Sequence, residues 1–181
     1  MDTQTAITES ARKLFCQFGF DGVGMAHIAQ EAGKNKATLY HYYKSKQELY
    51  NAVLKETIDY FLRHTALKLQ AAPIEELHLY IDALFSFELT SLSLIMRELS
   101  SQKKDCDKAN AQLLEGLDKE FVKLYTYGVG RGVFKLLEPT PLFDMLVGAI
   151  MLYRMGAHTK APSIKLYKEH LATHLLEIIQ H

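Results

Sequence analysis

Hydrophobic residues recur every three or four positions along most of the chain, which is the spacing of amphipathic α-helices. The first stripe consists of Ile7, Ala11, Leu14, Phe15 and Phe18, and Gly19 closes it. No segment long enough to predict a strand alternates between polar and apolar residues as a half-buried strand does. The pattern therefore predicts an all-α protein.

After Lys46 the helical pattern continues, and prolines and glycines divide it into segments. A first long helix is expected to end at Pro73 and to present the apolar residues Tyr50, Leu54, Ile58, Phe61, Leu62 and Leu69. Further helices are expected over residues 74–90, 92–100, 108–127, 141–157 and 163–180. We expect a domain boundary after Lys46, so that residues 1–46 form one domain and residues 47–181 a helical bundle.

The segment AQEAGKNKATLYHYYKSK, residues 29–46, has the spacing of a helix-turn-helix. Ala29 is small enough to let two helices cross closely, and Gly33 stands where the first helix must end, at a position that favours positive φ. Asn35 is a good N-cap for a second helix that runs to about Tyr43. Within that helix Leu39 is expected to face inward, and so is Tyr42.

The opposite face of this second helix is basic and aromatic. Lys36, Tyr40 and Lys44 recur every four residues, and no acidic residue occurs between positions 33 and 46. Ser45 and Glu48 form a capping box at the next helix start. A solvated surface is the plain interpretation of such lysines, but their helix is the one that a helix-turn-helix places in the major groove. The residues expected to meet DNA are Lys34, Asn35, Lys36, Ala37, Thr38, Tyr40, His41, Lys44 and Lys46.

At this point the chain resembles the tetracycline-repressor (TetR) family of transcriptional regulators. The resemblance covers residues 7–49: the first apolar stripe, Phe20-Asp21-Gly22, the run from Met25 to Ala29, the Leu39-Tyr40 pair and the Lys44-Ser45-Lys46 cap. A weaker match is GVGRGVF, residues 128–134. The chain departs from the family pattern at Val23-Gly24, where the family usually has two hydroxyl residues, and at Lys34, where it usually has a small apolar side chain.

The resemblance implies a ligand-responsive repressor that binds a two-fold operator in double-stranded DNA as a homodimer. Lys44 and Lys46 would hold phosphates, Lys36 could contact phosphate or base, and Ala37, Thr38, Tyr40 and His41 would contact bases. The expected dimer interface is a four-helix arrangement of helices 141–157 and 163–180, whose apolar residues could instead form a single-chain core. A small-molecule effector is expected in the C-terminal bundle, with candidate ligand residues Phe61, His64, Phe85, Glu88, Met96, Phe121, Tyr125 and Met151.

An enzyme would show a positioned nucleophile, an acid–base pair or a phosphate-binding glycine loop. Residues 128–132 contain three glycines, but they follow a predicted helix. A dinucleotide-binding glycine loop must follow a strand, so these glycines do not indicate such a site. We therefore expect no enzyme activity and no cofactor. The alternative is a helical protein-interaction adaptor that keeps the fold without specific DNA contacts. The departures from the family pattern at Val23, Gly24 and Lys34 would indicate this loss of DNA contacts.

Composition limits the remaining possibilities. The 21 basic and 21 acidic residues cancel, so attraction to DNA must come from the local lysine patch. Cys16 and Cys106 form no metal-type pair and suit a reducing cytoplasm, and a redox role for Cys106 stays open. His170 and His174 could share a metal ion, although two exposed histidines are the commoner interpretation, and we expect no metal site. No secretory pattern or membrane-spanning apolar run is expected.

Overall fold

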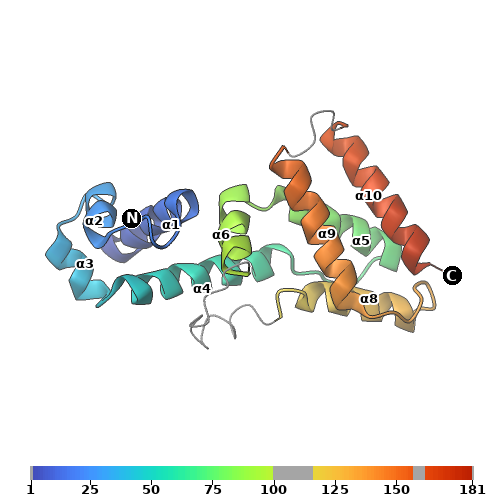
Figure 1. Ribbon diagram of the computed structural model, residues 1–181. Helices are drawn as coiled ribbons and strands as arrows, with labels where there is room; N and C mark the ends of the chain where they lie inside the picture. Colours follow the sequence, from blue (N-terminus) through green and yellow to red (C-terminus); the bar gives the residue numbers. More distant parts are fainter. Residues whose placement is uncertain (1, 100–115, 157–161, 181) are drawn as a thin grey trace. The chain divides into compact units, whose positions relative to one another are not determined.

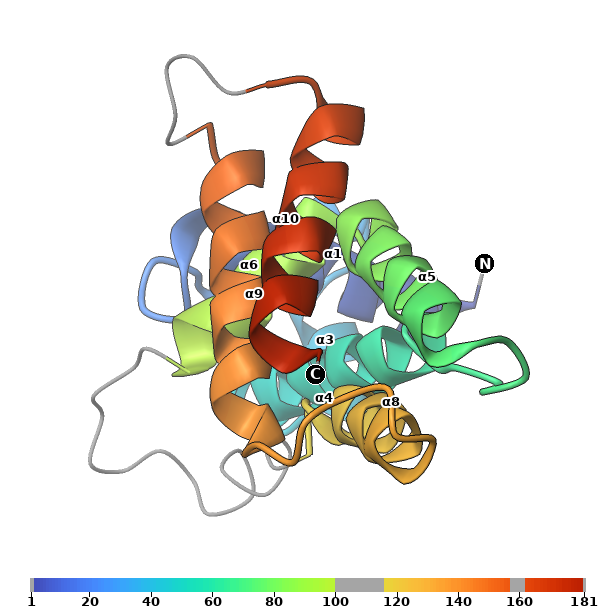
Figure 2. The ribbon, with the colours of Figure 1, turned by 90° about the vertical axis from the view of Figure 1, so that its right-hand side faces the viewer.

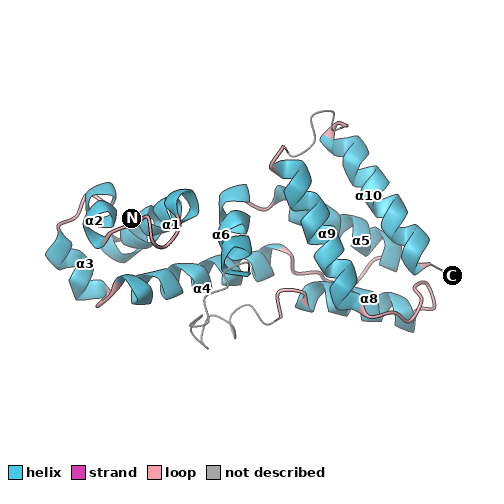
Figure 3. Cartoon of the chain, viewed as in Figure 1, coloured by secondary structure: helices cyan, strands magenta, loops and turns pink. Residues whose placement is uncertain are grey.

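The computed structural model describes residues 2–99, 116–156 and 162–180, and these are helical almost throughout (Figures 1 and 3). The helices are α1 (Thr3–Phe18), α2 (Met25–Glu31), α3 (Lys36–Tyr42), α4 (Lys46–His64), α5 (Pro73–Ser86), α6 (Leu89–Leu99), α8 (Lys119–Gly130), α9 (Pro139–Arg154) and α10 (Ile164–Ile179). In these residues β-pairing is limited to one isolated bridge between Phe134 and Gln180. The all-α prediction is confirmed.

The chain divides into two compact units. Unit 1 comprises Met1–Phe61 and Glu88–Glu115, and unit 2 comprises Leu62–Phe87 and Gly116–His181. This division by packing differs from the expected boundary after Lys46, because most of α4 belongs to unit 1 and the chain returns to that unit in α6. The functional boundary after Lys46 stays a prediction.

In unit 1, α1 packs against α2 and α6, and α2 packs against α3. Asp2 caps α1 by accepting from the backbone N–H of Thr5 at 2.9 Å, and Gly19 ends the helix at φ +72°. The predicted stripe is buried, with one exception. Phe18 is 47% exposed, because it ends the helix at the surface, where its ring lies 6.0 Å from that of His27.

The first long helix ends at His64, so the expectation that it runs to Pro73 is wrong. Residues 65–72 are non-helical, and Leu69 has φ +52° instead of lying on the apolar face of α4. The buried carboxylate of Glu76 explains this, since it accepts from the backbone N–H groups of Gln70 (2.7 Å) and Ala71 (2.9 Å). Those two donors are therefore used in a turn and not in a helix.

In unit 2, α5 packs against α8, α9 and α10, whose ribbons Figure 2 shows. Aromatic side chains form part of its core. The ring of Phe121 lies 5.7 Å from that of Tyr80 and 6.0 Å from that of Phe143. The glycine-rich segment is a helix end, as expected. A Cβ at Gly128 would lie 2.0 Å from the ring of Phe134, so only glycine permits this approach.

The other helix boundaries shift by a few residues. The break between the expected helices 74–90 and 92–100 falls instead at residues 87–88. Residues 108–115 of the expected helix 108–127 lie outside the described residues, and so does Cys106. In the described part of the chain no single helix is long and apolar enough to cross a membrane, and one sharply bent pair, α5 with α6, reaches that length and composition together.

Candidate nucleic-acid interface

The turn between α2 and α3 has the geometry that its sequence predicts. Gly33 has φ +61°, and the backbone N–H of Lys34 donates to the carbonyl of Ala29 at 2.9 Å. Ala29 is buried at the crossing, and Leu39 of α3 is fully buried beneath it. The two short helices are thus held by small residues and one apolar anchor.

Asn35 caps α3 with its side-chain oxygen. This oxygen accepts from the backbone N–H of Thr38 at 2.7 Å and from the Thr38 hydroxyl at 2.9 Å. The cap matters because α3 has only seven residues, so the end groups are a large share of its backbone donors.

The inward side of α3 differs from the prediction at one residue. Tyr42 is 40% exposed, and Tyr43 is 5% exposed in its place. The reason is that α3 ends at Tyr42, and the extended backbone of Tyr43 (φ −136°, ψ 114°) turns its side chain to the core. Its hydroxyl accepts from the amide of Gln4 on α1 at 3.3 Å.

The outer side of α3 is open. Lys36, Ala37, Tyr40, His41 and Lys44 are exposed, as is Asn35, whereas Lys34 and Thr38 are half-buried. The ammonium of Lys36 lies 5.7 Å from the ring centre of Tyr40. No carboxylate of the described residues pairs with Lys34, Lys36 or Lys44. Their three positive charges therefore remain available to an external anion.

The junction between α3 and α4 is capped in a variant of the predicted box. The hydroxyl of Ser45 accepts from the backbone N–H of Glu48 at 3.1 Å, as expected. The carboxylate of Glu48, however, accepts from the backbone N–H of Lys44 at 2.7 Å. One bond is thus shifted by one residue from the usual reciprocal pattern.

Lys46 is the site residue whose surroundings the sequence did not suggest. Its ammonium donates to the carbonyl of Phe20 at 2.9 Å and lies 4.1 Å from the centre of that residue's ring. The side chain is half-buried, unlike those of Lys36 and Lys44. A contact between residues 26 positions apart leaves no local sequence signal, so spacing alone could not reveal it.

The predicted effector residues fall in different units. Phe61, Glu88 and Met96 belong to unit 1, whereas His64, Phe85, Phe121, Tyr125 and Met151 belong to unit 2. His64 has a structural role, since its Nε2 lies 3.0 Å from both the Ala83 carbonyl and the Ser86 hydroxyl. Phe121 and Tyr125 do meet, with ring centres 6.2 Å apart.

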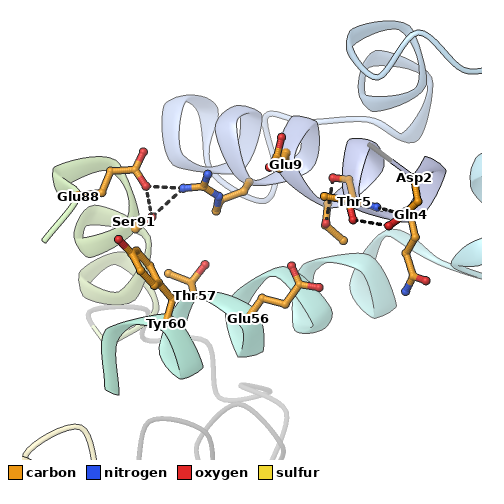
Figure 4. Close-up of a pocket in the computed structure, with 11 residues that line it drawn as sticks. Asp2, Gln4, Thr5, Glu9, Glu56, Thr57, Tyr60, Glu88 and Ser91 are labelled. Atoms are coloured by element: carbon orange, nitrogen blue, oxygen red, sulfur yellow. Dashed lines mark hydrogen bonds and ion pairs between the residues drawn. The ribbon is translucent and has the colours of Figure 1, made fainter. Parts of the chain in front are cut away.

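Glu88 lines a polar pocket of about 560 Å³ in unit 1, between residues of α1, α4 and the start of α6 (Figure 4). Its carboxylate lies 2.5 Å from the guanidinium of Arg12, which also donates to the Ser91 hydroxyl at 2.8 Å. Burial raises the pKa of Glu88, but bonds from Thr90, Ser91 and Arg12 outweigh it and hold the pKa below its ordinary value. Glu88 is thus fully engaged by the protein itself.

Sequence reasoning missed Tyr80. This side chain is fully buried in unit 2, and its hydroxyl has no hydrogen-bond partner among the described residues. Burial, followed by the nearby carboxylates of Glu120 and Asp118, raises the pKa of Tyr80, so the hydroxyl stays protonated. In the sequence Tyr80 has the spacing of an ordinary core residue, so nothing local marks its hydroxyl as functional.

The helices predicted to dimerise carry exposed apolar side chains. Met145 and Leu152 on α9 and Met155, which caps its C-terminus, are more than half exposed, and Leu166 and Ile178 on α10 are about two-fifths exposed. His170 and His174 lie on the exposed side of α10, with ring centres 6.5 Å apart. Across the described ranges, no group of three or more His, Cys, Asp or Glu residues could hold a metal ion.

The capped helix pair crosses at Ala29, turns at Gly33 and presents exposed lysines on and beside its second helix, and this arrangement defines a helix-turn-helix protein. Comparison with known proteins shows which helix-turn-helix family this segment resembles. Residues 7–53 match the model of the family described as bacterial regulatory proteins, tetR family. Over these residues the chain is similar to the tetR family.

Its relatives are described as regulators and not as enzymes. The chain is 32% identical to the HTH-type transcriptional regulator RutR of Escherichia coli strain K12, over 61% of this chain and 59% of RutR. It is 35% identical to an HTH-type transcriptional regulator of Staphylococcus aureus strain USA300, over 35% of this chain and 34% of that protein. The chain thus spans about three-fifths of RutR.

Solved structures show that the whole fold is shared. A TetR family protein from Vibrio parahaemolyticus has a TM-score of 0.80 at 19% identity, covering 99% of this chain and 100% of that one. A transcriptional regulator from Saccharomonospora viridis, solved in complex with choline, has a TM-score of 0.79 at 18% identity, covering 98% and 97%.

Proposed function

We propose that this protein is a transcriptional regulator that binds a two-fold operator as a homodimer in the cytoplasm and is released by a small-molecule effector. The observation that supports this most directly is the outer face of α3, where Tyr40 and His41 are exposed near three lysines whose ammonium groups pair with no carboxylate in the described part of the chain. Repression is the expected outcome, because a protein seated on an operator blocks access to it.

The lysine patch provides the attraction that the whole chain lacks. The net charge is zero, so the long-range field is weak and binding depends on phosphates brought close to Lys34, Lys36 and Lys44. Each phosphate contact should contribute about 0.9 to the slope of log affinity against log salt concentration. Duplex binding should therefore weaken steeply as salt rises.

The exposed side chains divide into two roles. Lys44 lies two residues after the end of α3 and is expected to hold phosphate, whereas Ala37, Tyr40 and His41 are exposed on α3, where base edges would lie. Thr38 is already bonded to Asn35, so its base contact would use its methyl group. Lys36 lies near Tyr40 and could join either set.

The test is selection of duplexes from a random pool by the purified full chain. Lys44→Met should weaken binding to all selected sequences alike, and Tyr40→Ala should also change which sequences are selected. If neither variant changes binding to any duplex, the assignment of this face to DNA is wrong. Binding to a protein partner in place of DNA would support the adaptor, but Val23 no longer favours it, because this residue is buried in the core.

Dimerisation through α9 and α10 would bury their exposed side chains. On α9 and its C-cap, spacings of four, three, four and three positions separate Pro141, Met145, Gly148, Leu152 and Met155, which is the pattern of a helix–helix seam. We expect Leu152→Asp to yield monomers in analytical ultracentrifugation. Leu136→Asp is the control, since Leu136 is exposed in the loop before α9 and lies off this seam. A dimeric Leu152→Asp protein would refute the interface.

The effector is expected in unit 2, near Tyr80. Its hydroxyl, which has no partner among the described residues, would donate a hydrogen bond to an acceptor atom of the ligand, and Phe121 would supply an apolar wall. A screen for metabolites that release the selected duplex would identify candidates. Tyr80→Phe should weaken release by the identified metabolite and leave duplex affinity without it unchanged. Equal release from both proteins would place the effector elsewhere.

A further inference from the structure

Lys46 differs from the other lysines of the DNA-facing segment in what its ammonium contacts. Among the described residues the ammonium groups of Lys34, Lys36 and Lys44 have no carboxylate or carbonyl partner, whereas that of Lys46 donates to the carbonyl of Phe20 and lies over its ring. The ammonium uses one of its three N–H donors on the carbonyl, and a phosphate contact would have to form without drawing it away from that carbonyl and from the ring. A cation on an aromatic face is stabilised by the ring quadrupole, and more so where water is partly excluded.

The ring that Lys46 covers is itself held in place. Phe20 lies 5.1 Å from the ring of Tyr50 in an edge-to-face arrangement and 6.2 Å from that of Phe15 in a stacked one. The hydroxyl of Tyr50 donates to the buried carboxylate of Glu98 at 2.7 Å. Phe20 is thus a fixed point between α1, α4 and α6 of unit 1.

Lys46 is also well placed to set the direction of α3. It is the first residue of α4 and follows the end of α3 by four positions. The bonds of Ser45 and Glu48 are local to this junction, and they shape the turn without tying it to another part of the domain. The contact with Phe20 ties it to the turn between α1 and α2, which is 26 positions away.

We propose that Lys46 is a positioning residue that fixes the angle of α3 through Phe20, and not one of the residues that contact phosphate. The part of this that concerns DNA rests on the proposed function. The lysine stem and ammonium hold the α3–α4 junction against the α1–α2 turn, so that the outer face of α3 is presented at one angle to the groove.

Binding as a function of salt separates the two roles. Lys46→Met keeps the stem but removes the charge, and should weaken duplex binding on the order of tenfold while the salt slope stays unchanged. Lys44→Met is the matched control, and its slope should fall by about 0.9. Lys46→Arg should recover most of the loss, because a guanidinium can donate to the carbonyl and stack on the ring.

Phe20→Leu supplies the second half of the test. It removes the ring and keeps the carbonyl, so it should weaken binding in the same direction as Lys46→Met. The double variant should bind little worse than the weaker single variant, because the two residues act through one contact. Full additivity of the two losses, or a slope reduced by about 0.9 in Lys46→Met, would overturn the proposal.

Amide hydrogen exchange of the free protein gives a measurement without DNA. Lys46→Met should accelerate exchange in α3, Lys46→Arg should restore its protection, and Lys44→Met should leave it unchanged. Unchanged protection in Lys46→Met would refute positioning even if duplex binding is lost. If the wild-type protein selects no duplex, the proposed function fails, and the exchange result still decides the role of Lys46.

Discussion

Replacing Gly33 by alanine should destabilise the helix-turn-helix by a predictable amount. Gly33 has φ +61°, and a Cβ built there meets no atom within 4 Å. The cost is therefore that of placing an L-residue in the left-handed region, about 1–2 kcal/mol, without a steric clash in addition. For a chain of this size such a loss lowers Tm by roughly 2–8 °C.

Gly24→Ala is the matched control in the same unit. Gly24 has φ −109° and likewise no neighbour within 4 Å, so alanine fits its backbone. The weaker N-cap and the reduced freedom of the unfolded chain nearly cancel, and stability should stay within about 0.5 kcal/mol of wild type. Urea unfolding followed by circular dichroism measures both variants. Equal stability of Gly33→Ala and Gly24→Ala would refute the conformational argument.

Three further predictions concern single side chains of unit 1. Asn35→Ala should lower the free energy of unfolding by about 1 kcal/mol, and Asn35→Ser should recover most of it, as measured by urea unfolding. Tyr50→Phe removes a bond to the buried Glu98 carboxylate and should cost about 1–3 kcal/mol in the same assay. Burial raises the pKa of Cys16 to about 11, so its thiol should resist alkylation at pH 8 in a Cys106→Ser background until the protein unfolds. Because the thiol ionises at lower pH in the unfolded chain than in the folded protein, the free energy of unfolding should fall as pH rises from about 9 towards 11.

The sequence was sufficient for those parts of the site that depend on local geometry. Gly33 and Asn35 could be assigned because a left-handed helix end and an N-cap each demand particular residue types. The exposed face of α3 followed from the four-residue spacing of Lys36, Tyr40 and Lys44. Such features need no knowledge of the rest of the fold.

Features that depend on distant residues could not be predicted. Periodicity placed Tyr42 in the core, but the helix ends one residue too early for that, and Tyr43 turns inward to meet Gln4. Periodicity also extended α4 to Leu69, since nothing local announces that Glu76 will take the backbone donors of Gln70 and Ala71. The first contact joins residues 39 positions apart and the second joins residues five and six positions apart, and each overrides the helical pattern.

The proposed interface assigns charge and geometry to different residues. Lys36 and Lys44 are exposed, and their ammonium groups have no carboxylate partner within the described ranges, so their contribution to binding should fade as salt screens them. Asn35 and Lys46 act through contacts inside the protein, where salt has less influence, and damage to them should weaken binding by a similar factor at every salt concentration. A chain without net charge can thus recognise DNA if its few free lysines are held at a fixed angle, because a misaligned helix loses base contacts that charge alone cannot replace.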